Sequence, residues 1–299
     1  MRRLFTIVLV TALICAAFLT GCSKEDQETA SAPAAENQTT PASEAGQTPA
    51  VETTLSGNYA FGGSTTVEPI ITAVIEEWKD LYPDVHISYE GVGSSSGIKG
   101  IIAGTYSLGA ASRELKDSET AKGISSTAIA LDAIAAVVNS DSVAISNLTT
   151  DELARIYAGE ITNWEELGGA DAPIVVYNRD ESSGTYETFE KKVMGKKEFI
   201  QDASVTTGNG DMASKVGATP NAIGYVGIGF IHEKGLRALT LNGVLPTMEN
   251  VYDGSYEVQR NLNITYPGTL SGLEKKFADY ILSRDGQEII ADLDFIPLP

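Results

Sequence analysis

The sequence predicts an α/β fold with mainly parallel sheets, because strand and helix signals alternate along most of the chain. Two observations support this fold class. The chain of 299 residues is 42% hydrophobic and only 20% charged, which is a globular composition and not a disordered one. Apolar runs of strand length also alternate with segments whose apolar residues recur at helical spacing. At roughly 150 residues per domain, the length predicts one large or two medium domains.

The N-terminal segment is predicted to direct export. Residues 1–3 are a short basic start, and residues 4–19 are apolar apart from two threonines. This stretch is too short and wrongly flanked for a membrane-spanning helix, so residues 1–21 are predicted to be a signal peptide. The sequence Leu-Thr-Gly-Cys at 19–22 resembles the bacterial lipobox. We therefore expect lipid on Cys22 and anchoring at the outer face of the cytoplasmic membrane. An ordinary secretory signal that ends in a chance Cys is the alternative.

Residues 22–56 are predicted to form a disordered tether. After Cys22 the segment is rich in Ala, Thr, Glu, Gln, Ser and Pro and has no aromatic residue. Its only large aliphatic residues are Val51 and Leu55, so burial cannot offset the entropy lost on ordering. The folded body is therefore expected from residue 57 to residue 299.

The first half of that body shows two helices and three strands. Thr65 and Glu68 are spaced as a capping box for a helix that continues to residue 81 and stops before Pro83. A strand over 85–92 and a short helix over 98–103 follow. Further buried strands are expected at 108–111 and at 128–138, and the second is long enough to pass from one domain into another.

The second half repeats the alternation. Thr149 and Glu152 are spaced to cap a helix ending near residue 157, and Ser183 is placed to cap one ending near residue 194. Strands are expected at 173–178 and 223–230. Ser271 and Glu274 are spaced to cap a final helix that carries apolar residues as far as residue 290.

The charge excludes some classes of ligand. The sequence has 40 acidic and 21 basic residues, a net charge of −19. Nucleic acid is therefore an improbable partner, because its phosphates require a basic surface. A small anion is still possible, since neutral donors can hold a buried oxyanion. The chain has only two His and two Cys, so neither a metal site nor a cofactor is expected.

Three turns rich in Gly, Ser and Thr carry the functional signal. They lie at 62–66, 93–97 and 182–185, each just before a predicted helix. Helix N-termini present unpaired N–H groups, Gly lets a ligand approach the backbone, and hydroxyl groups add donors. Arg179 precedes the third turn and could hold an oxyanion with two parallel hydrogen bonds. Each turn alone has an ordinary capping explanation, but three together predict an anion site.

At these motifs the chain resembles the phosphate-binding proteins that serve bacterial phosphate ABC importers. The similar segments are 63–66, 89–99, 108–113 and 178–185. The resemblance implies a periplasmic-binding-protein-like fold of two α/β domains with a hinge and an interdomain cleft. Domain I would comprise residues 57–133 and 260–299, and domain II residues 134–259. It also implies a monomer that captures inorganic phosphate and delivers it to permease subunits without catalysing a reaction.

The resemblance further implies which residues contact phosphate: Ser64, Thr65, Thr66, Ser94, Ser112, Arg179, Ser183, Gly184 and Thr185. Two of the matched positions depart from the family pattern. Ser112 stands where a well-studied branch has an Asp that accepts the proton of hydrogen phosphate. Glu181 stands where the family often has an Asp that braces the arginine. We expect Glu181 to brace Arg179, with proton recognition by Glu181 as the alternative.

Two other functions compete with phosphate binding. Another tetrahedral oxyanion, such as sulfate or molybdate, could occupy the same kind of site. A serine acyl hydrolase is the rival of another class, because 93–97 also satisfies G-x-S-x-G with Ser95 as nucleophile, and 96–99 satisfies S-x-x-K. The partners of such a nucleophile are missing, since His232 is the only downstream His and lies in a polar turn. The prediction is therefore a binding protein and not an enzyme.

Overall fold

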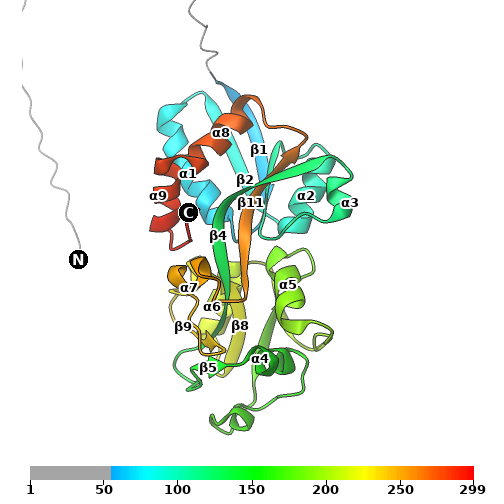
Figure 1. Cartoon of the computed structure of the whole chain (residues 1–299), viewed down its shortest axis with the longest axis vertical. Coiled ribbons are helices and arrows are strands. Elements are labelled where there is room, and N and C mark those ends of the chain that lie inside the picture. Colours follow the sequence, from blue (N-terminus) through cyan, green and yellow to red (C-terminus); the bar gives the residue numbers. More distant parts are fainter. Residues whose placement is uncertain (1–54) are drawn as a thin grey trace, which may run out of the picture. The chain divides into compact units, whose positions relative to one another are not determined.

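The computed structural model describes residues 55–299, and Figure 1 shows that they form two α/β lobes. The expectations for the signal peptide, for lipid on Cys22 and for the tether up to residue 54 lie outside the described residues. Within 55–299, no helix is both long enough and apolar enough to cross a membrane.

The first lobe is built on one mixed sheet. Its strands lie in the order β2, β1, β3, β11, β4. Their bounds are Gly57–Gly63 for β1, Val85–Gly91 for β2, Leu108–Ala111 for β3, Ile124–Asn139 for β4 and Gln259–Pro267 for β11. The helices of this lobe are α1 (Glu68–Leu81), α2 (Ser94–Ile102), α3 (Asp117–Thr120), α8 (Gly272–Leu282) and α9 (Arg284–Asp292).

The second lobe continues the same sheet through β4. Beyond β4 come β8 (Ala222–Gly227), β6 (Val175–Arg179) and β7 (Ser204–Thr206), while β9 (Leu236–Ala238) also pairs with β4. A small separate sheet joins β5 (Asn147–Leu148) to β10 (Thr240–Leu241). The helices are α4 (Thr150–Tyr157), α5 (Gly184–Phe189) with a π-helical turn to Met194, α6 (Asn209–Ala218) and α7 (Met248–Tyr252).

The prediction of mainly parallel sheets holds for the outer strands and fails for the central ones. β1 is parallel to β2 and β3, and β6 is parallel to β7 and β8. The central strands are antiparallel, however, because β11 pairs in the opposite direction with both β3 and β4, and β4 does so with β8. The cause is the chain path: β4 leaves the first lobe and β11 returns to it, so the two must run in opposite directions.

Strand β4 connects the lobes, as its predicted length indicated. Its residues up to Ala133 pair with β11, and from Ile134 onward they pair with β8. Figure 1 shows β4 and β11 running together from one lobe to the other. The two strands therefore place residues of both lobes around one crossing point.

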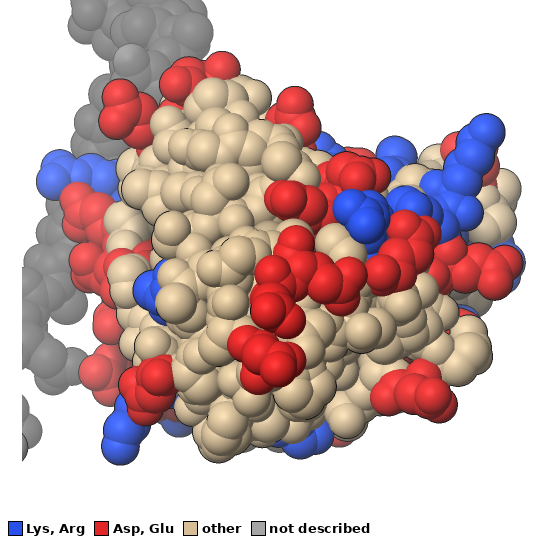
Figure 2. Space-filling view, turned by 90° about the horizontal axis from the view of Figure 1, so that it is seen from below, with Lys and Arg blue, Asp and Glu red and all other residues tan. Residues whose placement is uncertain are grey.

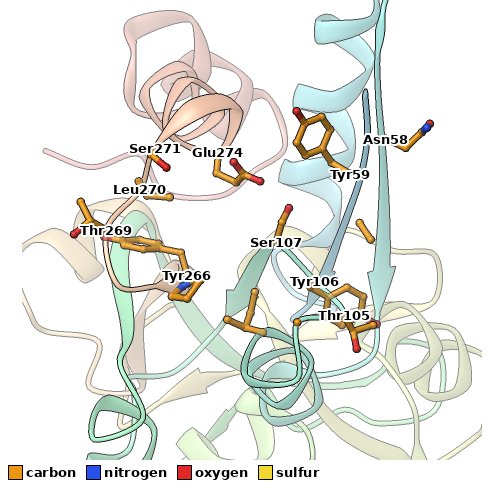
Figure 3. Close-up of a pocket in the computed structure, with 14 residues that line it drawn as sticks. Asn58, Tyr59, Thr105, Tyr106, Ser107, Tyr266, Thr269, Leu270, Ser271 and Glu274 are labelled. Carbon is orange, nitrogen blue, oxygen red and sulfur yellow. The ribbon is translucent and has the colours of Figure 1, made fainter. Parts of the chain in front are cut away.

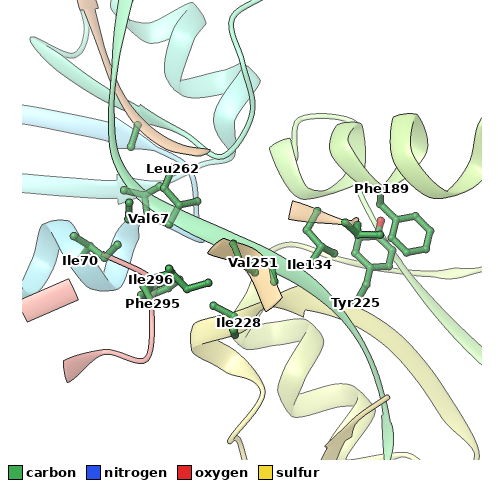
Figure 4. Packing of buried hydrophobic residues seen from close by; sticks show 14 of the residues in the cluster. Val67, Ile70, Ile134, Phe189, Tyr225, Ile228, Val251, Leu262, Phe295 and Ile296 are labelled. Carbon is green, nitrogen blue, oxygen red and sulfur yellow. The ribbon is translucent and has the colours of Figure 1, made fainter. Parts of the chain in front are cut away.

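Buried apolar residues pack on both sides of this crossing. Figure 4 shows Val67 and Leu262 in the first lobe and Phe189 and Tyr225 in the second, with Ile134 of β4 between them. The Phe189 and Tyr225 rings stack with centroids 4.0 Å apart. In the first lobe the rings of Phe61, Trp78 and Phe277 meet edge to face. Because α8 contributes Phe277, the end of the chain completes the core of its first lobe.

Helix starts agree with the predictions for α4 and α5 but not for α1 or for α8, where the Ser271 side chain forms no capping hydrogen bond. Thr149 and Glu152 form the expected capping box, and the Ser183 hydroxyl accepts from the Tyr186 N–H. The prediction of a Thr65–Glu68 capping box was wrong. Ser64 Oγ instead accepts from the Thr66 and Val67 N–H groups, at 3.1 and 3.4 Å. Residues 64–67 therefore form a turn before α1 begins.

Two later elements differ from prediction for local reasons. The final helix is two helices, because Ser283 ends α8 and caps α9 through the Gly286 N–H. The strand expected over 223–230 ends at Gly227. There the Ile228 N–H donates to Asp132 Oδ1 at 2.9 Å and leaves the strand ladder. That hydrogen bond connects the end of β8 to Asp132, which lies at the candidate site.

Candidate anion-binding site

The three predicted turns meet between the lobes. Thr66, from the turn after β1, lies 3.2 Å from Thr185, from the turn after β6, measured between their Oγ1 atoms. A Cβ atom on Gly184 would lie 2.4 Å from Ser94 Oγ and 2.7 Å from Ser112 Oγ, so a side chain there would displace both hydroxyl groups. Residues that are far apart in sequence and belong to different lobes therefore form one polar cluster.

This cluster is buried, which is unusual for polar residues. Gly184 is buried and Thr65 is half-buried. The other predicted contact residues are at most 2% exposed: Ser64, Thr66, Ser94, Ser112, Arg179, Ser183 and Thr185. The structure thus buries, fully or in part, the nine residues for which the resemblance implies anion contact, and it brings Thr66, Thr185, Ser94, Ser112 and Gly184 together.

The second turn joins the other two through its backbone. Gly93 has φ +86°, a conformation that favours glycine, and a Cβ there would strike Ser182. The Ser95 N–H donates to the Ser182 carbonyl at 3.0 Å. Ser94 Oγ accepts from the Ser112 N–H at 3.0 Å and lies 3.4 Å from Ser112 Oγ. The lobes are therefore closed on one another at this turn.

Arg179 is the charged group of the cluster. Its Nε donates to the Thr206 carbonyl and its Nη2 to the Thr207 carbonyl, both at 3.3 Å. Its Nη1 is buried and has no hydrogen-bond partner within residues 55–299, and the guanidinium forms no ion pair there. Burial lowers the pKa of Arg179, which reflects the cost of a desolvated cation. A buried cation with a free donor is suited to an anionic ligand.

Sequence reasoning missed a second arginine at the site. Arg260 and Asp132 are cross-strand partners in β11 and β4, and Arg260 Nη2 lies 2.7 Å from Asp132 Oδ2. The side chains are 3% and 0% exposed. Burial raises the pKa of Asp132, and the charge of Arg260 opposes that rise. A lone Asp within the apolar run at 128–138 was the signal that could have found this pair.

Arg260 also contacts the predicted hydroxyl groups. It donates to Thr66 Oγ1 at 3.2 Å and to Thr185 Oγ1 at 3.0 Å. Asn209, the first residue of α6, was missed as well. Its Nδ2 donates to Thr66 Oγ1 at 2.9 Å and to Thr65 Oγ1 at 3.3 Å. No sequence motif marked Asn209, because its role depends on where α6 packs.

Glu181 does not lie where the sequence placed it. Its side chain is exposed, and no hydrogen bond or ion pair within residues 55–299 joins it to Arg179. The carbonyl groups of Thr206 and Thr207 hold Arg179 instead. The neighbouring Asp180 accepts from the Ser182 N–H at 2.8 Å and so braces the turn rather than the arginine.

Ser95, the nucleophile of the rival hydrolase hypothesis, belongs to an ionic cluster. Its hydroxyl donates to Glu187 at 2.6 Å and accepts from Arg113 Nη2 at 2.9 Å. Arg113 and Lys116 of the first lobe also form ion pairs with Glu187 of α5, at 3.1 and 2.8 Å. The hydroxyl of Ser95 therefore contacts a carboxylate and a cation, and no His hydrogen-bonds to it within residues 55–299.

Surface pockets reach the buried cluster at its margins, where one is lined by Arg260 and another by Thr65 and Asn209. A pocket of about 620 Å³ in the first lobe is lined by Tyr59, Tyr106, Tyr266 and Glu274 among others, and Figure 3 shows these side chains around it. None of the predicted contact residues lines it. Another pocket of about 620 Å³ is lined by Thr65 and Asn209 together with Glu68 and Asp211. That pocket reaches the cluster from solvent.

Comparison with known proteins gives consistent matches. The family model for the PBP superfamily domain matches residues 43–285. The phosphate-binding protein PstS of Borreliella burgdorferi is 36% identical over 251 residues, which cover 79% of this chain and 88% of that protein. PstS of Bacillus subtilis is 33% identical over 247 residues, or 81% of each chain.

A solved structure matches at a similar level. It is a crystal structure of a putative phosphate ABC transporter substrate-binding protein from Clostridium perfringens with bound phosphate. It is 37% identical, with a TM-score of 0.77, and the match covers 81% of this chain and all of that one.

Proposed function

Because this chain belongs to the PBP superfamily and, within it, to the family of PstS phosphate-binding proteins, we propose that it captures inorganic phosphate between its lobes and delivers it to an ABC importer. One observation carries the proposal: Arg179 is buried at the meeting point of three hydroxyl-rich turns, and its Nη1 donor has no partner in residues 55–299. An oxyanion would satisfy that donor and compensate the buried charge.

We propose the site residues from the family resemblance, which this arrangement supports. The guanidinium of Arg179 supplies charge, and the turns supply hydroxyl and backbone donors to the four oxygens of a tetrahedral anion. We assign the anion contacts to Ser64, Thr65, Thr66, Ser94, Ser112, Arg179, Ser183, Gly184 and Thr185. No cofactor is required for such binding.

The acidic surface does not conflict with an anionic ligand. Figure 2 shows acidic side chains spread across one end of the molecule, with the largest group of basic side chains at the upper right. The net charge of −19 acts across solvent that contains salt, whose screening length is about 8 Å at physiological ionic strength. The donors of the cluster act at contact distance, where that screening is weak. Local donors therefore determine binding.

Calorimetric titration of the purified protein with phosphate, sulfate and molybdate tests this function. We expect binding of phosphate with the highest affinity. Ser112 can accept a proton but can also rotate to donate, so it rejects sulfate less strongly than a carboxylate does. Equal affinity for sulfate would mean that the protein binds tetrahedral oxyanions in general and is not specific for phosphate. No binding of any of the three anions would refute the proposal.

We also propose that the lobes are domains that close on the ligand. The change of partner along β4 supports boundaries after residue 133 and after residue 259, with domain I comprising 57–133 and 260–299 and domain II comprising 134–259. Only β4 and β11 would then bend. Small-angle scattering should show a smaller radius of gyration with phosphate than without it, and an unchanged radius would contradict closure.

We propose that the mature protein is a monomer held outside the cytoplasmic membrane by lipid on Cys22. Two acyl chains supply stable anchoring, whereas an acidic protein gains no attraction from anionic lipid. We expect Cys22→Ser protein to leave the membrane fraction. If Cys22→Ser protein stays with membranes after a salt wash, lipid on Cys22 is not what anchors the protein.

The protein is proposed to be a carrier and not an enzyme. The contacts of Ser95 support this assignment, because the carboxylate to which it donates, Glu187, is held in ion pairs with Arg113 and Lys116, and no His within residues 55–299 hydrogen-bonds to the hydroxyl. Esterase activity that disappeared in Ser95→Ala protein would overturn it.

A further inference from the structure

The hydroxyl groups of Thr66 and Thr185 are surrounded by donors. Thr66 Oγ1 lies 3.2 Å from Arg260 Nη2 and 2.9 Å from Asn209 Nδ2. Thr185 Oγ1 lies 3.0 Å from Arg260 Nη1. Each of these nitrogens can only donate, and Thr66 and Thr185 are each 1% exposed. Water therefore has little access to change the pattern.

Both acceptor positions of the Thr66 hydroxyl are filled. A hydroxyl accepts at most two hydrogen bonds, and Thr66 accepts one from Arg260 and one from Asn209. The amide orientation of Asn209 is fixed independently, because its Oδ1 accepts from the Gly227 N–H at 3.0 Å. The Thr66 hydrogen must consequently point away from both donors, toward Thr185 or toward an anion.

The direction of the Thr185 hydrogen follows from that of Thr66. Thr185 cannot donate to Thr66, whose acceptor positions are filled, and Arg260 accepts nothing. Within residues 55–299, no other hydrogen-bond partner of Thr185 Oγ1 is present. Its hydrogen is therefore left for a ligand in the cluster.

We propose that Arg260 is a positioning residue that turns the hydroxyl hydrogens of Thr66 and Thr185 toward the bound anion. This inference rests on the proposed function and identifies how the anion is oriented in that site. Asp132 neutralises Arg260 and fixes it, with Nε at 2.8 Å from Oδ2. The contribution of Arg260 is therefore the orientation of two donors and not net charge, which Arg179 provides.

A double-mutant cycle in the full chain tests this inference. Phosphate affinity is measured by calorimetry for the unmodified protein, for Arg260→Lys, for Thr185→Val and for both changes together. Lys keeps the charge beside Asp132 but cannot contact both hydroxyl groups. We expect Arg260→Lys to lower phosphate affinity about tenfold in the unmodified protein and only about threefold or less in the Thr185→Val protein.

Arg113→Lys is the matched control. Arg113 is also buried and also links the lobes, but it contacts Ser95, Glu119 and Glu187 and neither threonine. Arg113→Lys should change phosphate affinity by the same factor in the unmodified protein and in the Thr185→Val protein. If Arg260→Lys protein fails to fold, the pair Arg260→Met with Asp132→Leu removes the same donors and leaves no unpaired buried charge.

The outcomes separate this inference from the proposed function. A loss of the same factor in both backgrounds, or no loss at all, would show that Arg260 acts only in the structure and would overturn the inference. Complete loss of binding would also overturn it, because Arg179 and the other turns are predicted to retain weak binding. Failure of the unmodified protein to bind phosphate would instead refute the proposed function itself.

Discussion

Two buried arginines of the cleft are held in opposite ways. Arg179 contacts only carbonyl and hydroxyl oxygens, and its Nη1 has no partner in residues 55–299. Arg260 forms an ion pair with Asp132 at 2.7 Å and donates to two threonine hydroxyls. The first charge is compensated only when an anion binds, whereas the second is compensated within the protein. The difference indicates that one arginine serves the ligand and the other serves the shape of the site.

The largest expected effect comes from breaking the compensated pair. Asp132→Ala leaves the Arg260 cation buried without its partner, which costs about 3–5 kcal/mol of the free energy of unfolding. Urea unfolding without phosphate measures this loss. Asp279→Ala is the control, since Asp279 pairs with Lys275 on an exposed helix face and such pairs contribute about 0.5 kcal/mol. A similarly small loss of unfolding free energy for Asp132→Ala and Asp279→Ala would show that the Arg260 charge does not depend on Asp132 for compensation.

Arg179→Met should lower phosphate affinity and not stability, the opposite of what is expected for Asp132→Ala. Phosphate affinity should fall about a hundredfold or more, because charged hydrogen bonds to the ligand are lost. Stability without phosphate should not fall, since burial lowers the pKa of Arg179 and its charge has no anionic partner in the described residues. Calorimetry and urea unfolding separate the two quantities. Arg155→Met is the control: Arg155 is half-buried, pairs with Glu160 and lies outside the cluster, so affinity should not change and stability should fall by no more than about 0.5 kcal/mol.

A smaller effect is expected from the ion pairs between the lobes. Glu187→Gln weakens contacts from α5 to Arg113 and Lys116, which join the two lobes in this structure. A partly exposed pair contributes about 1 kcal/mol, so phosphate affinity should fall about fivefold. Glu190→Gln, at an exposed position beside α5, serves as the control. An affinity that is unchanged by Glu187→Gln would show that these pairs do not favour closure.

The smallest effect is expected at Glu181. Its side chain is exposed and does not contact Arg179, so Glu181→Gln should change phosphate affinity by less than about twofold. Phosphate and sulfate titrations check this expectation. A selective gain of sulfate binding would restore Glu181 as the residue that recognises the phosphate proton.

The comparison also shows what the sequence could predict. Arg179 and the three turns were identifiable because their function depends on local order: a strand, a turn and a helix start follow one another within a few residues. Ser183 is an example, since its hydroxyl caps the helix that begins at the next residue. The adjacency of Glu181 to Arg179 was misleading for a physical reason, because the turn exposes the carboxylate to solvent.

Asp132, Asn209 and Arg260 depend on pairing between distant segments. Asp132 and Arg260 face each other only because β11 pairs with β4 in one register, which a bulge between Leu262 and Asn263 helps to set. A charge within an apolar strand signals that a partner exists, but the partner could be named only once the register was known. Asn209 has no such signal, because asparagine at a helix start is common.

The position of β11 also affects how the chain can fold as it is made. In the first lobe β11 lies between β3 and β4, although its residues come near the end of the sequence. Until residues 259–267 have been synthesised, β3 and the first half of β4 have unpaired edges that invite pairing with other chains. The second lobe needs no such late strand, since its own strands end with β10 at Leu241. A chain truncated before Gln259 would thus lose the middle of a sheet, and aggregation during synthesis would be the expected result.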